Sequence, residues 1–490
     1  MTADVFPPGD YDVVVVGSGP GGLQTAYFLS RFGVRHAVIS ADHGPGGMFR
    51  RWPIFQRLLS WSKPDAPFGR GSREYEWYDH NSLLAEEPEL RGLVPGFMDR
   101  SWVVPSRPEM EQGLAAFAEQ AGVAVRYGCR WERTRREGDG RLVLETTAGE
   151  YRCRAAVFAL GVTEPWRSPI PGIEDVPHYS QTAEAASYAG KRVLVIGKRN
   201  SGFEVADGLL PWAQRVTLVS PRPAETGVIA LSSVRVRYLQ PLEDQALGGG
   251  TYVLDAAIDR IERSETCFQV FAQGTTRPGE YVLECDAAVA ATGFRTPLGD
   301  LARLGVRTVS QGRIPALTPL FEAAGAPGIF FAGNATQGAP GLKKRGVGAS
   351  SPAVHGFRYN ARVLAEHLAE QLGVRDRPRR PLAADEVVPF LASELARAPE
   401  LWAQKGYLCR VVGLDGPVDD GIQPLERFVD AGGPDAVAVA VETDAEGQVF
   451  PGVYLRRGGQ IHEAELDPHP LNAFDGEAYL RALARLVGEP

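Results

Sequence analysis

Residues 12–39 read DVVVVGSGPGGLQTAYFLSRFGVRHAVI, and this stretch decides the fold. The apolar run Val13–Val16 is typical of a strand buried in a parallel sheet. A glycine-rich turn follows it directly, and residues 23–30 then place apolar side chains at helical spacing. Residues 34–39 form the next apolar run. The order strand, turn, helix, strand predicts a βαβ unit with parallel strands.

The turn of this unit has glycines at the spacing G-x-G-x-x-G. Gly17 permits the tight bend, Gly19 lets a pyrophosphate approach the backbone, and Gly22 lets the helix pack close to the strand. Pro20 and Gly21 open the helix, whose free amides then face the phosphates. Because these residues stand inside a full βαβ unit, they predict a dinucleotide-binding site.

The end of the second strand departs from the usual pattern. An acidic residue that holds the ribose is expected roughly 20 residues after the glycines, but here Ser40 ends the strand and Asp42 follows two residues on. A serine hydroxyl can bind a ribose but lacks the charge-assisted contact of a carboxylate, so weaker adenosine binding is expected. Gly46, Gly47 and Met48 come next. The glycines allow this backbone to pass close to a flat ligand, and a plain turn is the alternative.

The composition excludes several classes of protein. The chain has 490 residues and a formal net charge of −8, so neither nucleic acid nor a membrane is expected as a partner. The first ten residues lack a basic segment and an apolar signal core, so a cytoplasmic protein is expected. The five cysteines are scattered without a C-x-x-C pair, which argues against a disulfide framework, a metal site and a reactive dithiol; they are Cys129, Cys153, Cys267, Cys285 and Cys409.

Residues 49–102 are rich in aromatic side chains, prolines and glycines and show little periodicity. Such a segment either covers a ligand or packs under long loops, and the sequence leaves both readings open. Ser62 and Lys63 follow Trp61 in this segment, and they are the candidates for hydrogen bonding to a reacting group. The favoured reading of the pair is a solvated start of a loop, because Pro64 follows it.

A second βαβ unit occupies residues 191–220. Residues 191–196 predict a strand, residues 203–210 a helix and residues 216–220 the following strand. The turn between the first strand and the helix reads GKRNSG, and two such units in one chain favour two dinucleotides. The residues expected at this second site are Gly197, Arg199, Asn200, Ser201 and Gly202.

Three residues decide which nucleotide the second unit takes. No acid stands at the end of its second strand, where Ser220 and Arg222 instead suit a 2′-phosphate, so NADP is favoured over NAD. Arg199 occupies the position of the middle glycine. Its side chain either obstructs the pyrophosphate or clamps it by charge, and a fold that has lost its nucleotide is the alternative.

Further strands are expected at residues 123–127, 155–161, 285–294 and 328–334, the last two returning the chain to the first unit. Glycines stand at the ends of these strands, namely Gly161, Gly293 and Gly333, and Asn334 follows the last of them. The last stretch of the chain, from about residue 376 to residue 490, differs in its sequence pattern from the rest. Its pattern predicts a helix near 387–397 and strands near 437–441 and 449–456.

From residue 11 to about residue 370 the chain resembles flavoproteins with two dinucleotide-binding domains. More narrowly, it is similar to flavin-containing monooxygenases and their pyridine-nucleotide–disulfide oxidoreductase relatives. The motifs that support the resemblance are Gly17–Gly22, Gly46–Gly47, Ser106–Met110, Ala159–Gly161, Ile170–Gly172, His178–Ser180, Asn200–Gly202, Ala291–Phe294 and Phe331–Asn334.

The resemblance implies FAD bound by Gly17–Gly22 and by Gly333–Asn334, with Gly46–Gly47 near the isoalloxazine ring. It also implies that Gly161 and Gly293 lie beside a cofactor. Two residues depart from the family pattern at this site. Ser40 replaces the usual acid of the second strand, and Asn334 replaces the usual Asp of the late strand.

The resemblance also implies NADPH at Gly197, at Asn200–Gly202 and at Arg222. Here Arg199 replaces a glycine, and the monooxygenase fingerprint after Gly172 is shortened and lacks its F-x-G. The reactive dithiol of the reductase branch is absent from the sequence, which argues against disulfide reduction.

The implied fold class is α/β, with two Rossmann-like dinucleotide-binding domains, the NADP domain inserted in the FAD domain, and a small C-terminal α+β domain. The expected boundaries are 1–180 and 286–375 for the FAD-binding domain, 181–285 for the NAD(P)-binding-like domain and 376–490 for the C-terminal domain.

The function that the resemblance implies is that of an NADPH-dependent monooxygenase. NADPH reduces FAD, the reduced flavin forms a C4a-(hydro)peroxide with O2, and one oxygen passes to an N or S atom or to a ketone of a small-molecule substrate. The protein positions the nicotinamide and excludes water, so no side-chain acid, base or nucleophile is required. The alternatives are a flavin oxidase or dehydrogenase that does not use NADPH, and a non-catalytic flavin-binding partner protein. The sequence leaves the oligomeric state open.

Overall fold

The computed structural model describes residues 5–47, 49, 57–224, 250–339, 341 and 348–488. The chain divides into two compact units. The first comprises Met1–Arg50, Ser60–Val162 and Thr296–Pro490, and the second comprises Arg51–Leu59 and Thr163–Arg295.

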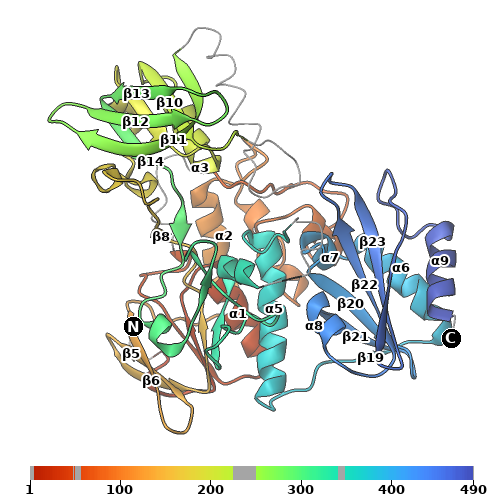
Figure 1. Cartoon of the computed structure of the whole chain (residues 1–490). Coiled ribbons are helices and arrows are strands. Elements are labelled where there is room, and N and C mark those ends of the chain that lie inside the picture. The colour runs from red at the N-terminus through yellow and green to blue at the C-terminus, as the bar shows by residue number, and fades with distance from the viewer. Residues whose placement is uncertain are drawn as a thin grey trace. The chain divides into compact units, whose positions relative to one another are not determined.

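The centre of the first unit is a parallel four-stranded sheet in the order β18-β7-β2-β3. Its strands are β2 (Val13–Val16), β3 (His36–Ile39), β7 (Ala155–Phe158) and β18 (Ile329–Phe331). Their apolar runs are almost fully buried, as expected where helices cover both faces of a parallel sheet. Two helices of this unit, α1 (Pro20–Arg31) and α5 (Val354–Gln371), pack against each other (Figure 1).

A second small sheet and a capped helix complete the part of this unit that precedes β19 (Arg380–Pro381) in the sequence, which is the predicted nucleotide-binding part. The sheet has the order β1-β6-β5-β4, and its strands are β1 (Gly9–Asp10), β4 (Trp131–Arg136), β5 (Leu142–Thr146) and β6 (Gly149–Cys153). Helix α2 (Arg107–Gln120) begins at a capping box, in which the backbone N–H of Ser106 donates to Glu109 Oε2 over 2.6 Å. A short antiparallel pair, β16 (Thr308–Val309) and β17 (Ile314–Pro315), also belongs to this unit.

The second unit contains a six-stranded sheet in the order β13-β12-β11-β10-β9-β14 (Figure 1). The strands are β9 (Arg192–Ile196), β10 (Arg215–Ser220), β11 (Thr251–Arg263), β12 (Phe268–Gly274), β13 (Glu280–Cys285) and β14 (Ala287–Ala290). Helix α3 (Asn200–Leu209) connects β9 to β10, which pair in parallel. A two-stranded ladder, β8 (Glu164–Pro165) with β15 (Phe294–Arg295), stands where the chain enters and leaves this unit.

Two strand predictions differ from the structure. The strand expected to return the chain to the first unit near residue 285 is β14, which pairs with β9 in the second unit instead. Its short apolar run suits a buried position in either parallel sheet, so the pattern cannot select between them. Residues 123–127 form no strand and make a single bridge, from Arg126 to Ile39.

The C-terminal part of the first unit is an antiparallel six-stranded sheet with helices, in the order β19-β21-β20-β22-β23-β24. Its strands are β19 (Arg380–Pro381), β20 (Leu408–Gly413), β21 (Val418–Pro424), β22 (Ala436–Thr443), β23 (Val449–Arg457) and β24 (Gln460–Glu465). Its helices are α6 (Val387–Arg397), α7 (Pro399–Ala403), α8 (Leu425–Asp430) and α9 (Glu477–Gly488). The predicted helix and both predicted strands of this region are confirmed. The predicted fold class is also confirmed, and no helix within the described ranges has the length and apolar character to cross a membrane.

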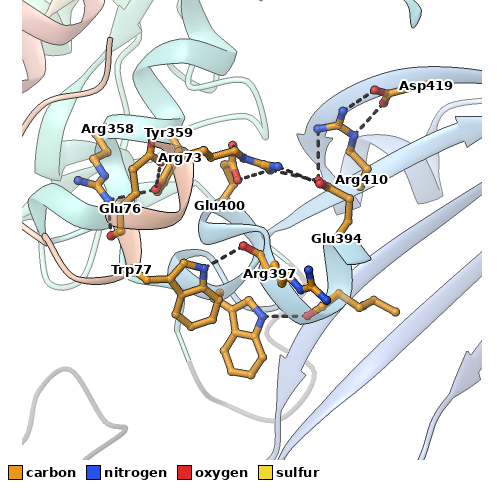
Figure 2. Close-up of polar contacts among 12 residues, drawn as sticks. Arg73, Glu76, Trp77, Arg358, Tyr359, Glu394, Arg397, Glu400, Arg410 and Asp419 are labelled. Carbon is orange, nitrogen blue, oxygen red and sulfur yellow. Dashed lines mark hydrogen bonds and ion pairs between the residues drawn. The ribbon is translucent and has the colours of Figure 1, made fainter. Parts of the chain in front are cut away.

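Arg73 joins the C-terminal part to the nucleotide-binding part of the same unit (Figure 2). It lies on a 3₁₀ turn, Arg73–Trp77, and donates to Glu394 Oε1 over 2.9 Å and to Glu400 Oε2 over 2.7 Å. The two glutamate side chains are only 7% and 8% exposed. Burial opposes the charge of Arg73, but the two carboxylates outweigh it and raise the pKa of Arg73.

Gln404 makes a second connection between the same two parts. Its side chain is fully buried and donates to Asn360 Oδ1 over 2.5 Å and to the carbonyl oxygen of Gly356 over 3.1 Å. Asn360 in turn donates to Thr336 Oγ1 over 2.9 Å, in the turn that follows β18. The C-terminal sheet is therefore linked by buried hydrogen bonds to the start of α5 and to the segment after β18.

Removing the Arg73 guanidinium tests how far the C-terminal part depends on this contact. Arg73→Gln should lower the free energy of unfolding by about 2 kcal/mol, because Glu394 and Glu400 stay buried after losing their shared cation. Denaturant unfolding of the full chain measures the effect. Arg100→Gln is the control, since its pair with Asp65 is 62% and 79% exposed, and it should cost less than about 0.5 kcal/mol. Equal losses in the two variants would contradict the expectation.

Candidate nucleotide-binding sites

The first glycine turn brings β2 and α1 into direct backbone contact. Gly17 has a φ of +116°, and a Cβ added there would overlap the carbonyl oxygen of Ala159 after β7. A Cβ added at Gly22 would overlap the carbonyl oxygen of Gly17. The N–H of Gly17 donates to the carbonyl oxygen of Ile39 over 2.8 Å, which fixes the turn to β3. Glycine is therefore required at both positions.

The N-terminus of α1 is arranged to receive an anion. Gly19 is its N-cap, no side chain caps the helix, and its first turn contains no acidic residue. Helix α2 differs, because Ser106 and Glu109 satisfy its first amides. A Cβ built on Gly19 meets nothing within 4 Å, so open space lies in front of the helix amides. These features fit a bound pyrophosphate.

Gly333 and Asn334 lie beside this helix start. A Cβ added at Gly21 would overlap the backbone of Gly333, so the two segments approach as closely as glycine allows. Asn334 Oδ1 is buried and has no hydrogen-bond partner among the described residues. A buried acceptor without a partner beside an uncapped helix indicates a position where a ligand supplies the missing donor. The structure thus brings together residues 17–22 and 333–334, and they fit a dinucleotide such as FAD.

The end of β3 places a carboxylate next to the turn. Ser18 Oγ donates to Ser40 Oγ over 2.9 Å, and Ser40 Oγ donates to Asp42 Oδ2 over 3.3 Å. The Ser40 hydroxyl is therefore already hydrogen-bonded on both sides. Asp42, which follows Ser40 by two residues, is the acidic group of this loop. A Cβ added at Gly47 would lie 3.4 Å from the Cα of Gly19, so this loop packs against the turn.

Gly46 and Gly161, two more residues expected near FAD, both have a positive φ. Gly46 has a φ of +110° and donates its N–H to the carbonyl oxygen of Ser18 over 3.0 Å, so it also belongs to the loop beside the turn. Gly161 has a φ of +69° and follows β7. Met48 lies outside the described residues.

The second glycine turn repeats the first contact for contact. Gly197 has a φ of +122°, and a Cβ there would overlap the carbonyl oxygen of Ala291 after β14. A Cβ at Gly202 would overlap the carbonyl oxygen of Gly197. The N–H of Gly197 donates to the carbonyl oxygen of Val219 over 2.9 Å, as Gly17 does in the first unit. The sheet neighbour is equivalent too, since β14 lies beside β9 as β7 lies beside β2.

Arg199 is the N-cap of α3 and has the extended backbone that Gly19 has in α1. Its φ is −114° and its ψ is −171°, values that any residue adopts. Its side chain is exposed. No side chain caps α3, and Asn200 and Ser201 form its first turn. The arginine is accommodated without backbone strain, and it places a positive charge at a helix start.

The other predicted residues of this unit lie at two strand ends. Ser220 ends β10 and donates to the carbonyl oxygen of Arg222 over 3.4 Å, and the Arg222 side chain is exposed. Gly293 follows β14, and its carbonyl oxygen accepts the Nε2–H of His178 over 2.9 Å and the N–H of Trp166 over 3.0 Å. Since Gly293 offers only an acceptor there, His178 has its proton on Nε2, and burial lowers its pKa. These contacts make His178 a structural residue.

Lys198 is a residue of the second turn that sequence reasoning missed. Its side chain is 1% exposed and pairs with Asp255 on β11. Asp255 also accepts a hydrogen bond from Thr276 over 2.8 Å, and its hydrogen bond with Lys198 lowers the pKa of this carboxyl. Because Asp255 is the register partner of Ser220, the pair fixes the turn to the strand end where the 2′-phosphate is expected.

Ser62 and Lys63 have contacts that suit a structural role. Ser62 is fully buried, donates to Asp79 Oδ1 over 2.5 Å and accepts from Asn81 Nδ2 over 2.9 Å. The Lys63 ammonium is exposed and lies 5.1 Å from the ring centre of Trp61. In the described part of the aromatic segment, Trp77 packs against the C-terminal part of the unit. Its Nε1–H donates to the carbonyl oxygen of Arg397 over 2.8 Å (Figure 2).

The described residues contain no group of side chains arranged for metal binding and no disulfide-bonded cysteines. Within the described ranges, no three His, Cys, Asp or Glu side chains are grouped to hold a metal ion. All five cysteines lie inside those ranges and are free thiols, four of them buried. Burial raises the pKa of Cys153 to about 12 and that of Cys285 to about 12, which keeps both thiols protonated and unreactive.

Comparison with known proteins identifies the family. The model of the pyridine nucleotide-disulphide oxidoreductase family matches residues 14–333. The chain belongs to this family. The predicted resemblance is confirmed, and at the level of the family so is the prediction of FAD and NADPH as cofactors.

Individual relatives and a solved structure are similar at low identity. The FAD-dependent oxidoreductase domain-containing protein 2 of Danio rerio is 24% identical over 460 residues, which are 83% of this chain and 65% of that protein. The chain thus spans less than two thirds of that relative. A ferredoxin–NADP reductase of Salinispora tropica is 29% identical over 376 residues, 74% of this chain and 96% of that enzyme. The structure of a flavin-containing monooxygenase from Stenotrophomonas maltophilia aligns with a TM-score of 0.56 at 21% identity, over 74% of this chain and 99% of that one.

Substitutions at two glycines of the first turn separate ligand contact from folding. Gly19→Ala should leave the unfolding midpoint of the apoprotein unchanged, because the added Cβ meets no protein atom within 4 Å. It should weaken FAD binding at least about tenfold, because the methyl group enters the space in front of the α1 amides. Gly22→Ala should lower both stability and FAD content. The measurements are thermal unfolding and FAD titration of apoprotein, and unchanged FAD affinity in Gly19→Ala would place the pyrophosphate elsewhere.

Proposed function

We propose that the protein is an NADPH-dependent flavin monooxygenase that oxidises a nucleophilic N or S atom or a ketone of a small molecule. The observation that supports this most directly is the repetition of the glycine turn. The contacts of Gly17 and Gly22 with neighbouring carbonyl oxygens recur at Gly197 and Gly202. Two turns of the same geometry suit one flavin nucleotide and one pyridine nucleotide.

The cysteines support an electron acceptor other than a protein dithiol. All five are free, and none lies within two residues of another in the sequence. A disulfide reductase needs a paired and reactive thiol, and the buried cysteines have protonated side chains. Dioxygen and a small organic substrate are acceptors that need no such pair.

The chain's own residues have three tasks in this reaction. The uncapped starts of α1 and α3 bind the two pyrophosphates. Asn334 Oδ1 accepts a hydrogen bond from the flavin nucleotide, and Arg199 and Arg222 attract the phosphates of NADPH. Bound FAD would supply the redox chemistry, accepting a hydride and reducing O2. No side-chain nucleophile is needed.

A second candidate is an NADPH-dependent reductase that passes electrons to an iron–sulfur protein. The ferredoxin–NADP reductase of Salinispora tropica favours it, since the match covers 96% of that enzyme. This candidate shares both nucleotide sites with the first and differs only in the acceptor. Its activity would require ferredoxin and would proceed without oxygen insertion.

Anaerobic titration of the FAD-bound protein with NADPH tests the proposed function. We expect the visible flavin absorption to bleach, and admission of air in the presence of an amine, sulfide or ketone substrate to restore it with one oxygenated product per NADPH. Bleaching followed by electron transfer to ferredoxin, without oxygenated product, would establish the second candidate. A flavin band that NADPH does not change would contradict both and favour an oxidase that is reduced by its substrate.

Substitution of Arg199 tests the second nucleotide site. Arg199→Gly should weaken NADPH binding about threefold to tenfold, because the loss of the charge that attracts phosphate outweighs the removal of the side chain from the space before the α3 amides. Arg199→Lys should retain most of the affinity. Arg277→Gln is the control, since it removes an exposed arginine from the same unit. Tighter binding by Arg199→Gly would show that the arginine obstructs the pyrophosphate.

A further inference from the structure

Two arginines at the junction of α5 with the C-terminal sheet have buried N–H groups without partners. These atoms are Nε and Nη2 of Arg377 and Nη1 of Arg427, which find no acceptor among the described residues. Arg377 precedes β19, and Arg427 lies on α8. Buried donors in native proteins are nearly always paired, so several unpaired donors at one place indicate a ligand.

The surroundings leave the two guanidinium groups incompletely neutralised. Glu370 on α5 lies 4.0 Å from Arg427, and Arg377 reaches only the carbonyl oxygen of Asp420, over 3.5 Å. Burial and the charge of Arg377 lower the pKa of Arg427, and the carboxylates of Glu370 and Asp420 oppose this shift only in part. Asp420 itself pairs with Arg379 over 2.9 Å.

The Arg427 side chain is 31% exposed, so the place is only partly buried. Like charges held close at such a place are costly unless an anion joins them. His367 adds no charge at neutral pH, because burial and the two arginines lower its pKa to about 4.

Each of the two arginines lines a cavity. One of about 290 Å³ is lined by Arg427, Arg379 and the buried Arg456, and another of about 240 Å³ is lined by Arg377 and Arg379. Carboxylates also line both cavities, among them Asp420 in the first and Asp419 in the second. Arg456 is 7% exposed and donates to the carbonyl oxygen of Phe428. Figure 1 shows α8 beside β21, and the Arg427–Glu370 contact connects α8 to α5. The side chains of Arg377 and Arg427 therefore each border space that a small molecule can occupy.

We infer that Arg377 and Arg427 bind the phosphate group of a small molecule at the junction of α5, α8 and β21. A carboxylate offers two oxygens and can satisfy one guanidinium fork, whereas a phosphate offers three terminal oxygens and can bridge two forks. The larger cavity then receives the remainder of a phosphate ester. This site is separate from the residues assigned to FAD and NADPH, and it does not depend on the proposed function.

Calorimetric titration of the full-length protein at constant ionic strength tests the inference, with glycerol 3-phosphate and inorganic phosphate as probes. The wild-type protein should bind at least one of them. Arg377→Gln and Arg427→Gln should each weaken that binding at least about tenfold. Arg481→Gln should bind as the wild type does, since Arg481 is an exposed arginine of α9 in the same C-terminal part. Tighter binding of glycerol 3-phosphate would identify an ester as the ligand, and equal binding would identify free phosphate.

Two results would overturn the inference. One is the absence of binding by both probes at concentrations up to about 10 mM. This concentration is well above the dissociation constant expected when two guanidinium groups contact one phosphate. The other is unchanged binding in the Arg377→Gln and Arg427→Gln variants, which would assign the phosphate to the nucleotide turns. Arg427→Lys distinguishes a loss of binding from a loss of folding, because lysine keeps the positive charge but lacks the two-donor geometry of the guanidinium group. It should show the unfolding midpoint of the wild type and an intermediate affinity.

Discussion

The structure depends on one close contact, which the third residue of α1 and the third residue of α3 each make with the first glycine of the preceding turn. In both units a carbonyl oxygen of the turn occupies the place where a side chain of the third glycine would stand. The carbonyl oxygen of the alanine that follows a neighbouring parallel strand lies against the first glycine in the same way. This packing sets the direction of α1 and α3, and their direction decides where the uncapped amides point. The proposed nucleotide binding thus depends on a steric requirement of the backbone.

The sequence predicted most of the secondary structure because its signals are local. Apolar runs, glycine turns and amphipathic spacing located the strands around both turns and the helix Val387–Arg397. The failures concern partners that are distant in the sequence. The run at Ala287–Ala290 was assigned to the wrong sheet, because a buried parallel strand has the same pattern in any sheet. Residues 123–127 alternate as a strand does but find only one bridging partner.

The candidate sites were predictable where glycine geometry defines them and less so where side chains meet across elements. Residues 17–22 and 333–334 come together as expected, whereas the buried Lys198–Asp255 pair connects a turn to a strand more than fifty residues away. No periodic pattern in the sequence predicts a side-chain contact between such distant residues. The same holds for Arg73 and Gln404, which hold the C-terminal part against the nucleotide-binding part of its unit through buried polar groups. Their sequence neighbourhoods give no sign of a common location.

The backbone at Arg199 has a consequence for how such folds are recognised. Its conformation is extended, as at Gly19, so the fold itself imposes no choice of residue there. Only the outer two glycines are dictated by packing. The middle position can therefore change over evolution at little cost in stability, and selection on cofactor affinity alone governs it. A search that demands three glycines would overlook domains like the second one. Two glycines five residues apart, followed much later by an apolar strand ending in alanine and glycine, form a more faithful signature of this architecture.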